Sequence, residues 1–233
     1  MSYDTLCSME QIEQDLLNNF RPPAFPGSFF ISFEGIEGAG KSTQIIKIKD
    51  YLESKNYRVL VLREPGGTPF GEKLRSAILN TKTTLHPVAE AHLFAASRAQ
   101  LLEEVTLKEL SVPNTVVICD RYIDSTMAYQ GIARNLGIKT ILDMHNCFPL
   151  NLVPHLTFYL KISIETSQER QKMRNAPKDY FESQGIEFYR NLVEGYEQAY
   201  QLFPKRIKLI DAEKNGDEVY KSVLKELVNL LEN

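Results

Sequence analysis

The segment Gly35-Ile-Glu-Gly-Ala-Gly-Lys41-Ser42 limits what this chain can fold into more than any other part of it. It follows an apolar run, Phe29–Phe33, that predicts a buried strand, and it precedes a helical pattern over Lys41–Lys55. A glycine-rich turn of the form G-x-x-x-x-G-K-[ST] between a strand and a helix is the signature of a phosphate-binding loop. Its glycines let backbone N–H groups converge on phosphate oxygens, and the helix N-terminus favours an anion. We therefore expect a nucleoside triphosphate to bind here.

Two side chains of the loop are expected to act on the bound triphosphate directly. Lys41 is predicted to place its ammonium group beside the β and γ phosphates, and the Ser42 hydroxyl is predicted to ligate Mg²⁺. A second metal-orienting group is predicted at Asp120, which closes the apolar run Thr115–Cys119. An Asp after a strand is often a helix cap, but beside a phosphate loop the metal-orienting role is favoured. ATP and Mg²⁺ are therefore the expected cofactors. The residues expected to contact ATP are Gly35, Ile36, Glu37, Gly38, Ala39, Gly40, Lys41, Ser42 and Thr43.

Short apolar runs alternate with longer helical patterns over most of the chain. The predicted strands are Phe29–Phe33, Arg58–Leu62, Thr115–Cys119, Leu156–Leu160 and Arg206–Ile210. Helical patterns fill the intervals, including Val88–Leu110 and Asp217–Leu231. This alternation predicts a three-layer α/β fold, a five-stranded parallel sheet with helices on both faces. In such a fold the ligands bind at the carboxyl ends of the strands.

Composition argues against several other classes of protein. The chain has 233 residues and a net charge of −3, whereas a nucleic-acid-binding protein is usually basic, so we expect no nucleic-acid partner. No apolar run reaches the ~18 residues that span a bilayer, and we expect no membrane association. The three cysteines match neither a disulfide framework nor a zinc site. Because Met1–Gly27 lacks the pattern of a secretory signal, we expect a cytoplasmic protein.

The chain is predicted to consist of an N-terminal extension and one main domain. Within residues 1–27, Met9–Phe20 has the pattern of a short amphipathic helix, and the Pro-rich stretch Arg21–Gly27 stops it. Residues 28–233 hold the alternating pattern, and a short basic lid is expected at about residues 170–185. The sequence suggests no role for the extension.

Three kinds of protein use such a phosphate loop: GTP-hydrolysing switches, motor or transporter ATPases, and small-molecule kinases. The chain lacks the Asn-Lys-x-Asp segment by which a switch reads guanine. A motor normally has a longer chain with coupling modules. A kinase needs arginines around an acceptor pocket and a mobile basic lid, and the chain has both patterns. The basic lid residues are Arg170, Lys172, Arg174 and Lys178. The kinase interpretation is therefore favoured.

Three further motifs carry a resemblance to a known family. They are Arg63-Glu-Pro-Gly-Gly-Thr68, the pair Phe94 and Arg98, and Asp120-Arg-Tyr-Ile-Asp-Ser-Thr-Met-Ala-Tyr-Gln-Gly131. In order and spacing they resemble bacterial thymidylate kinase, and the resemblance extends from about Phe29 to the C-terminus. It implies direct phosphoryl transfer from ATP-Mg²⁺ to dTMP, giving dTDP and ADP without a phospho-enzyme.

The resemblance also implies roles for side chains around the phosphate and the sugar. Arg63 and Arg121 would hold the phosphate of dTMP, where their charge offsets the repulsion between the two substrates. Tyr129 would close against the sugar where a ribose carries its 2′-hydroxyl, and Glu37 would reach the 3′-hydroxyl. Gln130 would help to frame the nucleoside.

The base would be held by three other matched residues. Phe94 would stack on the thymine ring, Arg98 would donate to a base carbonyl, and Thr126 would bond the base edge. Taken one at a time and without context, these residue types instead favour Phe94 as core and Arg98 as a solvated helix charge, and they allow Thr126 as a helix cap. A kinase for another nucleoside monophosphate therefore remains an alternative. The resemblance further implies a homodimer, formed through the helical region Val88–Leu110.

The lid departs from the family pattern. Gly38 stands where some relatives carry a catalytic arginine, so the lid is expected to supply one. In Asp179-Tyr-Phe-Glu182, Tyr180 stands where the family has an arginine. We predict that Arg174 takes this role, because transfer needs positive charge where the migrating group becomes exposed. The alternative is a nucleotide-binding protein whose catalysis is impaired. The predicted catalytic residues are Lys41, Asp120, Arg121 and Arg174.

Overall fold

The predicted strands form one parallel sheet in the computed structural model, which describes residues 12–173 and 180–232. They are β1 (Phe29–Glu34), β2 (Arg58–Arg63), β3 (Thr115–Asp120), β4 (Leu156–Lys161) and β5 (Ile207–Asp211). Each predicted strand is confirmed, and none of its ends differs by more than about one residue, which is within the usual uncertainty of strand ends. The strand order is β2-β3-β1-β4-β5, so the phosphate loop follows the central strand.

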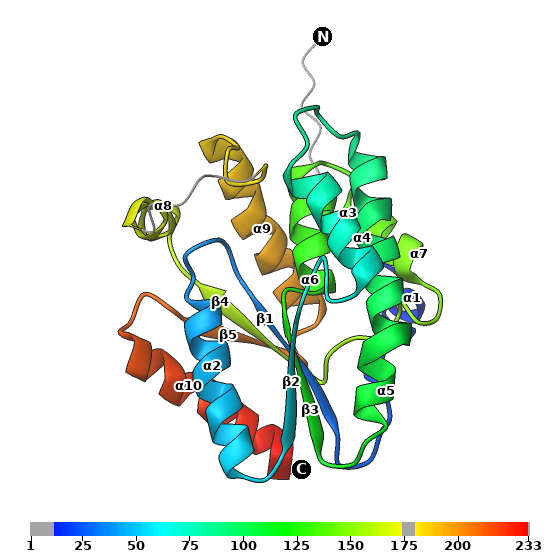
Figure 1. Cartoon of the computed structure of the whole chain (residues 1–233). Helices are drawn as coiled ribbons and strands as arrows, with labels where there is room; N and C mark the ends of the chain where they lie inside the picture. The colour runs from blue at the N-terminus through cyan, green and yellow to red at the C-terminus, as the bar shows by residue number, and fades with distance from the viewer. Residues whose placement is uncertain (1–11, 174–179, 233) are drawn as a thin grey trace.

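Helices cover both faces of the sheet, which confirms the predicted three-layer α/β class (Figure 1). On one face α2 (Lys41–Ser54) packs beside α10 (Gly216–Glu232). The helix predicted over Val88–Leu110 is α4 (Pro87–Leu101), continued by the wider turns of η1 (Leu102–Thr106) and by α5 (Leu107–Leu110). The other helices are α1 (Gln14–Asn18), α3 (Pro69–Leu79), α6 (Ile123–Thr126), η2 (Met127–Ala133), α7 (Ile138–His145), α8 (Ile164–Met173) and α9 (Ile186–Leu202). Among the described residues, no helix has the length and apolar character needed to cross a membrane.

The central strands are buried because helices pack on both sides of them. In β1 the side chains of Ile31 and Phe33 are fully buried, and the Phe33 ring lies 4.9 Å from that of Phe158 in β4. Burial on both faces explains why these strands are continuous apolar runs rather than alternating ones. The edge strand β2 is more open, and Val61 on it is exposed. The phosphate loop therefore starts from a buried central strand of the sheet.

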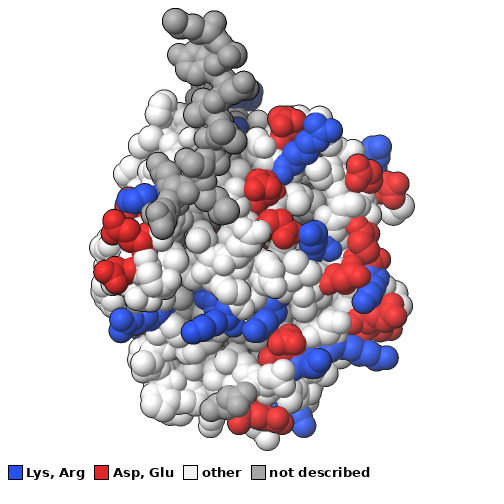
Figure 2. Space-filling model, turned by 180° about the vertical axis from the view of Figure 1, so that it is seen from behind, with Lys and Arg blue, Asp and Glu red and all other residues white. Residues whose placement is uncertain are grey.

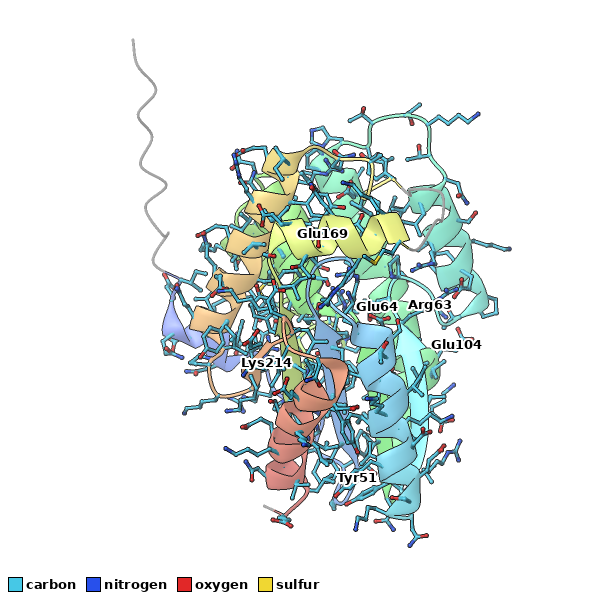
Figure 3. The ribbon with its side chains drawn as sticks, turned by 90° about the vertical axis from the view of Figure 1, so that its left-hand side faces the viewer. Tyr51, Arg63, Glu64, Glu104, Glu169 and Lys214 are labelled. Atoms are coloured by element: carbon cyan, nitrogen blue, oxygen red, sulfur yellow. The ribbon has the colours of Figure 1, made fainter. Side chains whose placement is uncertain are left out.

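Parallel pairing aligns the ends of the strands that carry polar residues. Phe33 of β1 pairs with Asp120 of β3, and Arg63 of β2 pairs with the same Asp120. Arg63, Asp120 and the phosphate loop after β1 thus share one edge of the sheet, as expected for strands that run in one direction. Figure 3 shows Arg63 and Glu64 at this edge, below α8 in that view.

The described part of the N-terminal extension packs on the main domain. The predicted helix is observed as the shorter α1, while residues 1–11 lie outside the described part of the chain. Leu16 and Phe20 are buried in the common core, and the Phe20 ring lies 6.3 Å from that of Phe203. The backbone of Arg21 forms a parallel bridge with Leu152. Residues 12–27 therefore contribute to the core of the domain.

Candidate active site

A cleft opens beside the phosphate loop at the carboxyl edge of the sheet. Every acceptor-binding residue predicted from the sequence lines the cleft: Glu37, Arg63, Phe94, Arg98, Arg121, Thr126, Tyr129 and Gln130. Asp120 lines it as well. The sequence analysis missed several other lining residues: Glu64, Pro65, Arg75, Leu79, Tyr122, Ser125 and Phe181.

The phosphate loop has the backbone geometry that its glycines were expected to provide. Gly35 has a φ of 132°, and a Cβ at this position would collide with the carbonyl oxygen of Leu160. The loop leads into α2, whose N-cap residue Gly40 makes no side-chain cap. Lys41 is buried, and its Nζ donates to the carbonyl oxygens of Gly35 at 3.0 Å and Ile36 at 3.3 Å. The ammonium group thus lies over the loop, where a phosphate would approach.

The pKa of Lys41 is lowered to about 8. Burial is the largest cause, and the nearby charge of Arg121 adds to it. The carboxylates of Asp120, Glu37 and Glu34 act in the opposite direction. A bound anion would favour the charged form of Lys41, since an opposite charge raises the pKa of an amine.

Glu37 joins the phosphate loop to the acceptor cleft. Its Oε1 accepts a hydrogen bond from Arg121 Nη2 at 2.6 Å and another from the Tyr129 hydroxyl at 2.7 Å. Burial opposes ionisation of Glu37, but the charges of Arg121 and Lys41 outweigh it, so the pKa of Glu37 is lowered. Nη1 of Arg121 donates to Gly35 O, Ser125 Oγ and the Tyr196 hydroxyl. Arg121 is therefore held rigidly at the point where the loop and the cleft meet.

Arg63 is held more loosely than Arg121. Its Nη2 lies 3.0 Å from Glu72 Oε2, and both side chains are about half exposed. An exposed pair of this kind contributes at most about 1 kcal/mol. Arg63 is therefore free to exchange Glu72 for a ligand anion at little cost.

Arg98 is buried, which contradicts the alternative of a solvated helix charge. Only 1% of its side chain is exposed, and it is bonded to Glu64, Thr126 and His145. Burial alone would lower the pKa of Arg98, but the Glu64 carboxylate raises it, and the net shift is upward. Thr126 accepts from Arg98 Nη2 at 3.0 Å, so its hydroxyl belongs to the same network.

Aromatic rings form one wall of the cleft. The Phe94 ring lies 6.1 Å from that of Phe181, and Phe181 also meets Tyr129 at 5.3 Å and Phe188 at 6.4 Å. Phe94 is only partly buried, so its ring packs on the core without being enclosed by it. Phe181 lies in the segment where the sequence analysis sought only a missing arginine. The signal that could have indicated this wall is the pair of consecutive aromatic residues Tyr180 and Phe181.

Comparison with known proteins identifies the family. The thymidylate kinase family model matches residues 33–223 of the chain. The chain belongs to the thymidylate kinase family. It is 40% identical over 195 residues to a thymidylate kinase of Thermoanaerobacter sp. (strain X514), covering 84% of this chain and 95% of the relative. With that of Caldanaerobacter subterraneus it shares 42% identity over 196 residues, covering 84% and 93%.

A solved structure of the family shows the same fold. The crystal structure of thymidylate kinase from Ehrlichia chaffeensis matches with a TM-score of 0.66 and 31% identity. The match covers 87% of this chain and 99% of the other. The likeness therefore extends over nearly the whole of the solved thymidylate kinase chain.

The lid side of this thymidylate kinase family member is described up to residue 173 and again from residue 180. Arg170 Nη1 donates to Gly38 O at 3.0 Å, and its Nη2 donates to Ala212 O at 3.2 Å. A Cβ on Gly38 would lie 3.2 Å from the Arg170 Cβ and from Ser167 O, so α8 leaves little room for a side chain there. Arg174, the predicted catalytic lid residue, lies outside the described residues.

Tyr180, which stands where the family has an arginine, packs against Arg134. The guanidinium of Arg134 lies 5.2 Å from the centre of its ring, and Arg134 also stacks 4.8 Å from the ring of Phe188. Cation–π contacts of this kind contribute about 0.5 to 2 kcal/mol. Arg134 and these rings therefore fix the base of the lid to the rest of the domain.

The residues predicted to hold Mg²⁺ fit that ion chemically. Asp120 Oδ1 is buried and has no hydrogen-bond partner among the described residues, so it is an acceptor oxygen available to a cation. The Ser42 side chain is exposed in the first turn of α2. Mg²⁺ prefers oxygen ligands and usually combines one or two protein oxygens with phosphate and water. In the described parts of the chain, no group of three or more His, Cys, Asp or Glu side chains could hold a metal ion by itself.

Proposed function

We propose that this chain transfers the γ-phosphoryl group of ATP to dTMP, giving dTDP and ADP. The observation that carries the proposal is the position of Glu37. It belongs to the phosphate loop, and it also lines the acceptor cleft beside Arg121 and Tyr129. A donor on the loop and an acceptor in the cleft would therefore be adjacent, so the phosphoryl group needs no carrier on the protein. Positioning and charge supply most of the catalysis in such a transfer.

Two arginines that line the cleft would bind the phosphate of dTMP. Arg63 ends β2, and Arg121 follows β3 with a φ of 72°, in the left-handed region that non-glycine residues rarely adopt. That backbone places the guanidinium toward Glu37 and the loop. An incoming phosphate would compete with Glu72 for Arg63 and with Glu37 for Arg121. Displacing Glu37 would free its carboxylate for the 3′-hydroxyl of the sugar.

The base would be read by one donor and one acceptor of the cleft. Arg98 would donate to a carbonyl of thymine. Gln130 Nε2 is fixed by Glu90 at 2.8 Å, while its Oε1 has no partner among the described residues. This oxygen is suited to accept the N3–H of the base. The Phe94 ring would stack on the base, and the Tyr129 ring would stand against C2′ of the sugar.

The donor side would use the loop and α8. Lys41 would carry its charge to the β and γ phosphates, and Arg170 would hold the loop against Ala212. Mg²⁺ held by Ser42 and Asp120 would neutralise charge on these phosphates. As transfer proceeds, Lys41, Arg121 and Arg63 would together stabilise the charge spread over the migrating group.

A coupled assay of ADP release tests the acceptor. With dTMP, dUMP, UMP, AMP and GMP at equal concentrations, we expect the highest kcat/KM for dTMP. Lys41→Ala should abolish transfer and leave far-ultraviolet circular dichroism unchanged. Equal rates with UMP and dTMP would refute the assignment of the acceptor, and transfer that survives Lys41→Ala would refute the role of the loop.

We propose that Arg174 supplies the lid charge. Arg174→Ala should lower kcat by at least about tenfold with a smaller effect on the KM for dTMP, because the charge is needed mainly in the transition state. The exposed neighbour Lys172 is the matched control, and Lys172→Ala should leave kcat within about twofold. An unchanged kcat in Arg174→Ala would show that another residue supplies this positive charge.

We also propose a cytoplasmic homodimer that associates through α4 and the helical turns after it. Val88 on α4 is an exposed large apolar residue, which supports an interface there. Small-molecule substrates are its proposed partners, with no nucleic acid. On the face seen in Figure 2, Lys and Arg occur among Asp and Glu, so the charge there is mixed. Light scattering should give twice the monomer mass for the wild type and a monomer for Val88→Lys.

A further inference from the structure

His145 ends α7 and makes a direct contact with the acceptor cleft residue Arg98. Its side chain is fully buried, and Nε2 lies 2.8 Å from Arg98 Nη1. His145 itself is not one of the described residues that line the cleft. Any effect of His145 on a bound nucleotide would therefore pass through Arg98.

The chemistry of the two groups fixes the protonation of His145. A guanidinium has only N–H donors, so Nε2 of His145 must offer a lone pair to it. The hydrogen of the imidazole is then on Nδ1, which lies 2.7 Å from the carbonyl oxygen of Ile141 and donates to it. The pKa of His145 is lowered to about 3, mainly by burial and next by the charge of Arg98, with a smaller effect of His92. His145 is therefore neutral near pH 7.

An inventory of the Arg98 donors shows what His145 leaves available. Of the five N–H groups of an arginine, two face Glu64 Oε2, which lies 2.7 Å from Nε and 2.6 Å from Nη2. The second hydrogen on Nη2 points to Thr126 Oγ1 at 3.0 Å, and one on Nη1 goes to His145. Among the described residues, one N–H of Nη1 is left without an acceptor.

The guanidinium is also held on one face of its plane. The ring of Tyr122 lies 4.8 Å from the Arg98 Cζ, and Tyr122 is itself fixed by its hydroxyl, which donates to Leu152 O at 2.8 Å. Glu64 and Thr126 hold the Nε and Nη2 side of the fork, and His145 is what holds Nη1. Without that acceptor, Nη1 would have two unsatisfied hydrogens and the guanidinium could twist to satisfy them elsewhere.

We propose that His145 is a positioning residue that holds Arg98 so that its one remaining N–H reads the 4-carbonyl of the acceptor base. The proposal rests on the proposed function. Thymine presents an oxygen acceptor at this position, whereas cytosine presents an amine that would face the N–H donor. A site that offers a buried donor rejects such a base because two donors are left unpaired. His145 would thereby favour dTMP over dCMP without touching either.

Two substitutions separate this role from simple packing. His145→Gln places an amide oxygen near the position of Nε2 and keeps the acceptor, whereas His145→Leu keeps the bulk and removes it. His145→Leu should raise the KM for dTMP about tenfold or more, as expected for losing a hydrogen bond to a charged group. Its preference for dTMP over dCMP in kcat/KM should fall by a similar factor, with the KM for ATP unchanged.

The glutamine variant is the rescue, and a surface histidine is the control. His145→Gln should keep the KM for dTMP and the dTMP preference within about threefold of the wild type. His92 is exposed on α4, and His92→Gln should change neither value. If folded His145→Leu keeps its KM for dTMP, or if His145→Gln is as impaired as His145→Leu, the positioning role is wrong.

Nuclear magnetic resonance of ¹⁵N-histidine in the wild-type protein gives a readout independent of activity. We expect His145 to show a protonated Nδ1 and an unprotonated Nε2, with no titration between about pH 5 and 8. A protonated Nε2, or a titration in this range, would overturn the proposal even if His145→Leu did not fold. A wild type that fails to phosphorylate dTMP would instead refute the proposed function, and the tautomer would still report whether His145 accepts from Arg98.

Discussion

Nη2 of Arg121 lies 2.6 Å from Oε1 of Glu37, and this ion pair ties the end of β3 to the phosphate loop. The two side chains are 19% and 15% exposed, so water screens the pair only weakly. The same oxygen accepts the hydroxyl of Tyr129 at 2.7 Å. The pair therefore holds the acceptor wall against the loop before any substrate contact is made.

Glu37→Gln should cost about 2 kcal/mol of unfolding free energy, because the Arg121 charge loses its partner in a poorly solvated place. Tyr129→Phe removes the other bond to the same oxygen and leaves the charges paired, so it should cost only about 1 kcal/mol. Urea unfolding monitored by circular dichroism measures both. Equal losses in the two variants would show that the charge of Glu37 does not matter for stability.

ATP binding should be coupled to proton uptake near pH 8. With a pKa of about 8, Lys41 lacks its proton in about half of the free protein at that pH. A bound triphosphate raises this pKa, so titration calorimetry in buffers of different ionisation enthalpy should detect uptake of about half a proton. Lys41→Arg stays charged at this pH and should show no such uptake. Wild-type binding without uptake at pH 8 would contradict the lowered pKa.

Stability should fall with rising pH because of Glu34. Its pKa is raised from 4.5 to about 8, first by burial and then by the Asp124 carboxylate. The folded state therefore holds the proton more tightly than the unfolded chain. Its contribution is complete below pH 4.5 and is lost as the pH rises to about 8. Glu34→Gln stays neutral and should still accept the Tyr122 N–H that Glu34 accepts at 2.7 Å.

The urea midpoints of the wild type and Glu34→Gln should therefore diverge between about pH 5 and about pH 8.5, with the variant gaining relative stability at the higher pH. The exposed Glu187 is a control, and Glu187→Gln should follow the wild type at both values. If the difference in urea midpoint between the wild type and Glu34→Gln stays constant over this range, the pKa of Glu34 is not raised to about 8.

The N-terminal extension should stabilise the domain. Phe20→Ala removes a ring that is buried against Phe203 and should lower the unfolding free energy by about 3 kcal/mol. Gln14→Ala on the exposed side of α1 should change it by less than about 0.5 kcal/mol. Thermal unfolding of both variants compares them directly. If Phe20→Ala unfolds at the wild-type temperature, the packing of residues 12–27 does not contribute to stability.

The sequence by itself determined the sheet, the phosphate loop and part of the acceptor site. These features are encoded in consecutive residues: an apolar run forms a buried strand, and Gly35–Ser42 folds as a turn between that strand and a helix. Because parallel strands end at one edge, motifs that follow different strands had to meet there. The alignment of Arg63, Asp120 and the phosphate loop could therefore be predicted without coordinates.

Only the tertiary structure decided how those residues are held. Arg98 and His145 are 47 positions apart, and no periodic pattern links them. Likewise nothing local predicts that Phe181 returns to face Phe94, or that Phe20 is buried rather than part of a free extension. The physical reason is that a hydrogen-bond partner or a ring contact depends on where the chain returns in space. The residue type determines which kinds of group a side chain can bind. The tertiary structure determines which of those groups lies close enough to be bound.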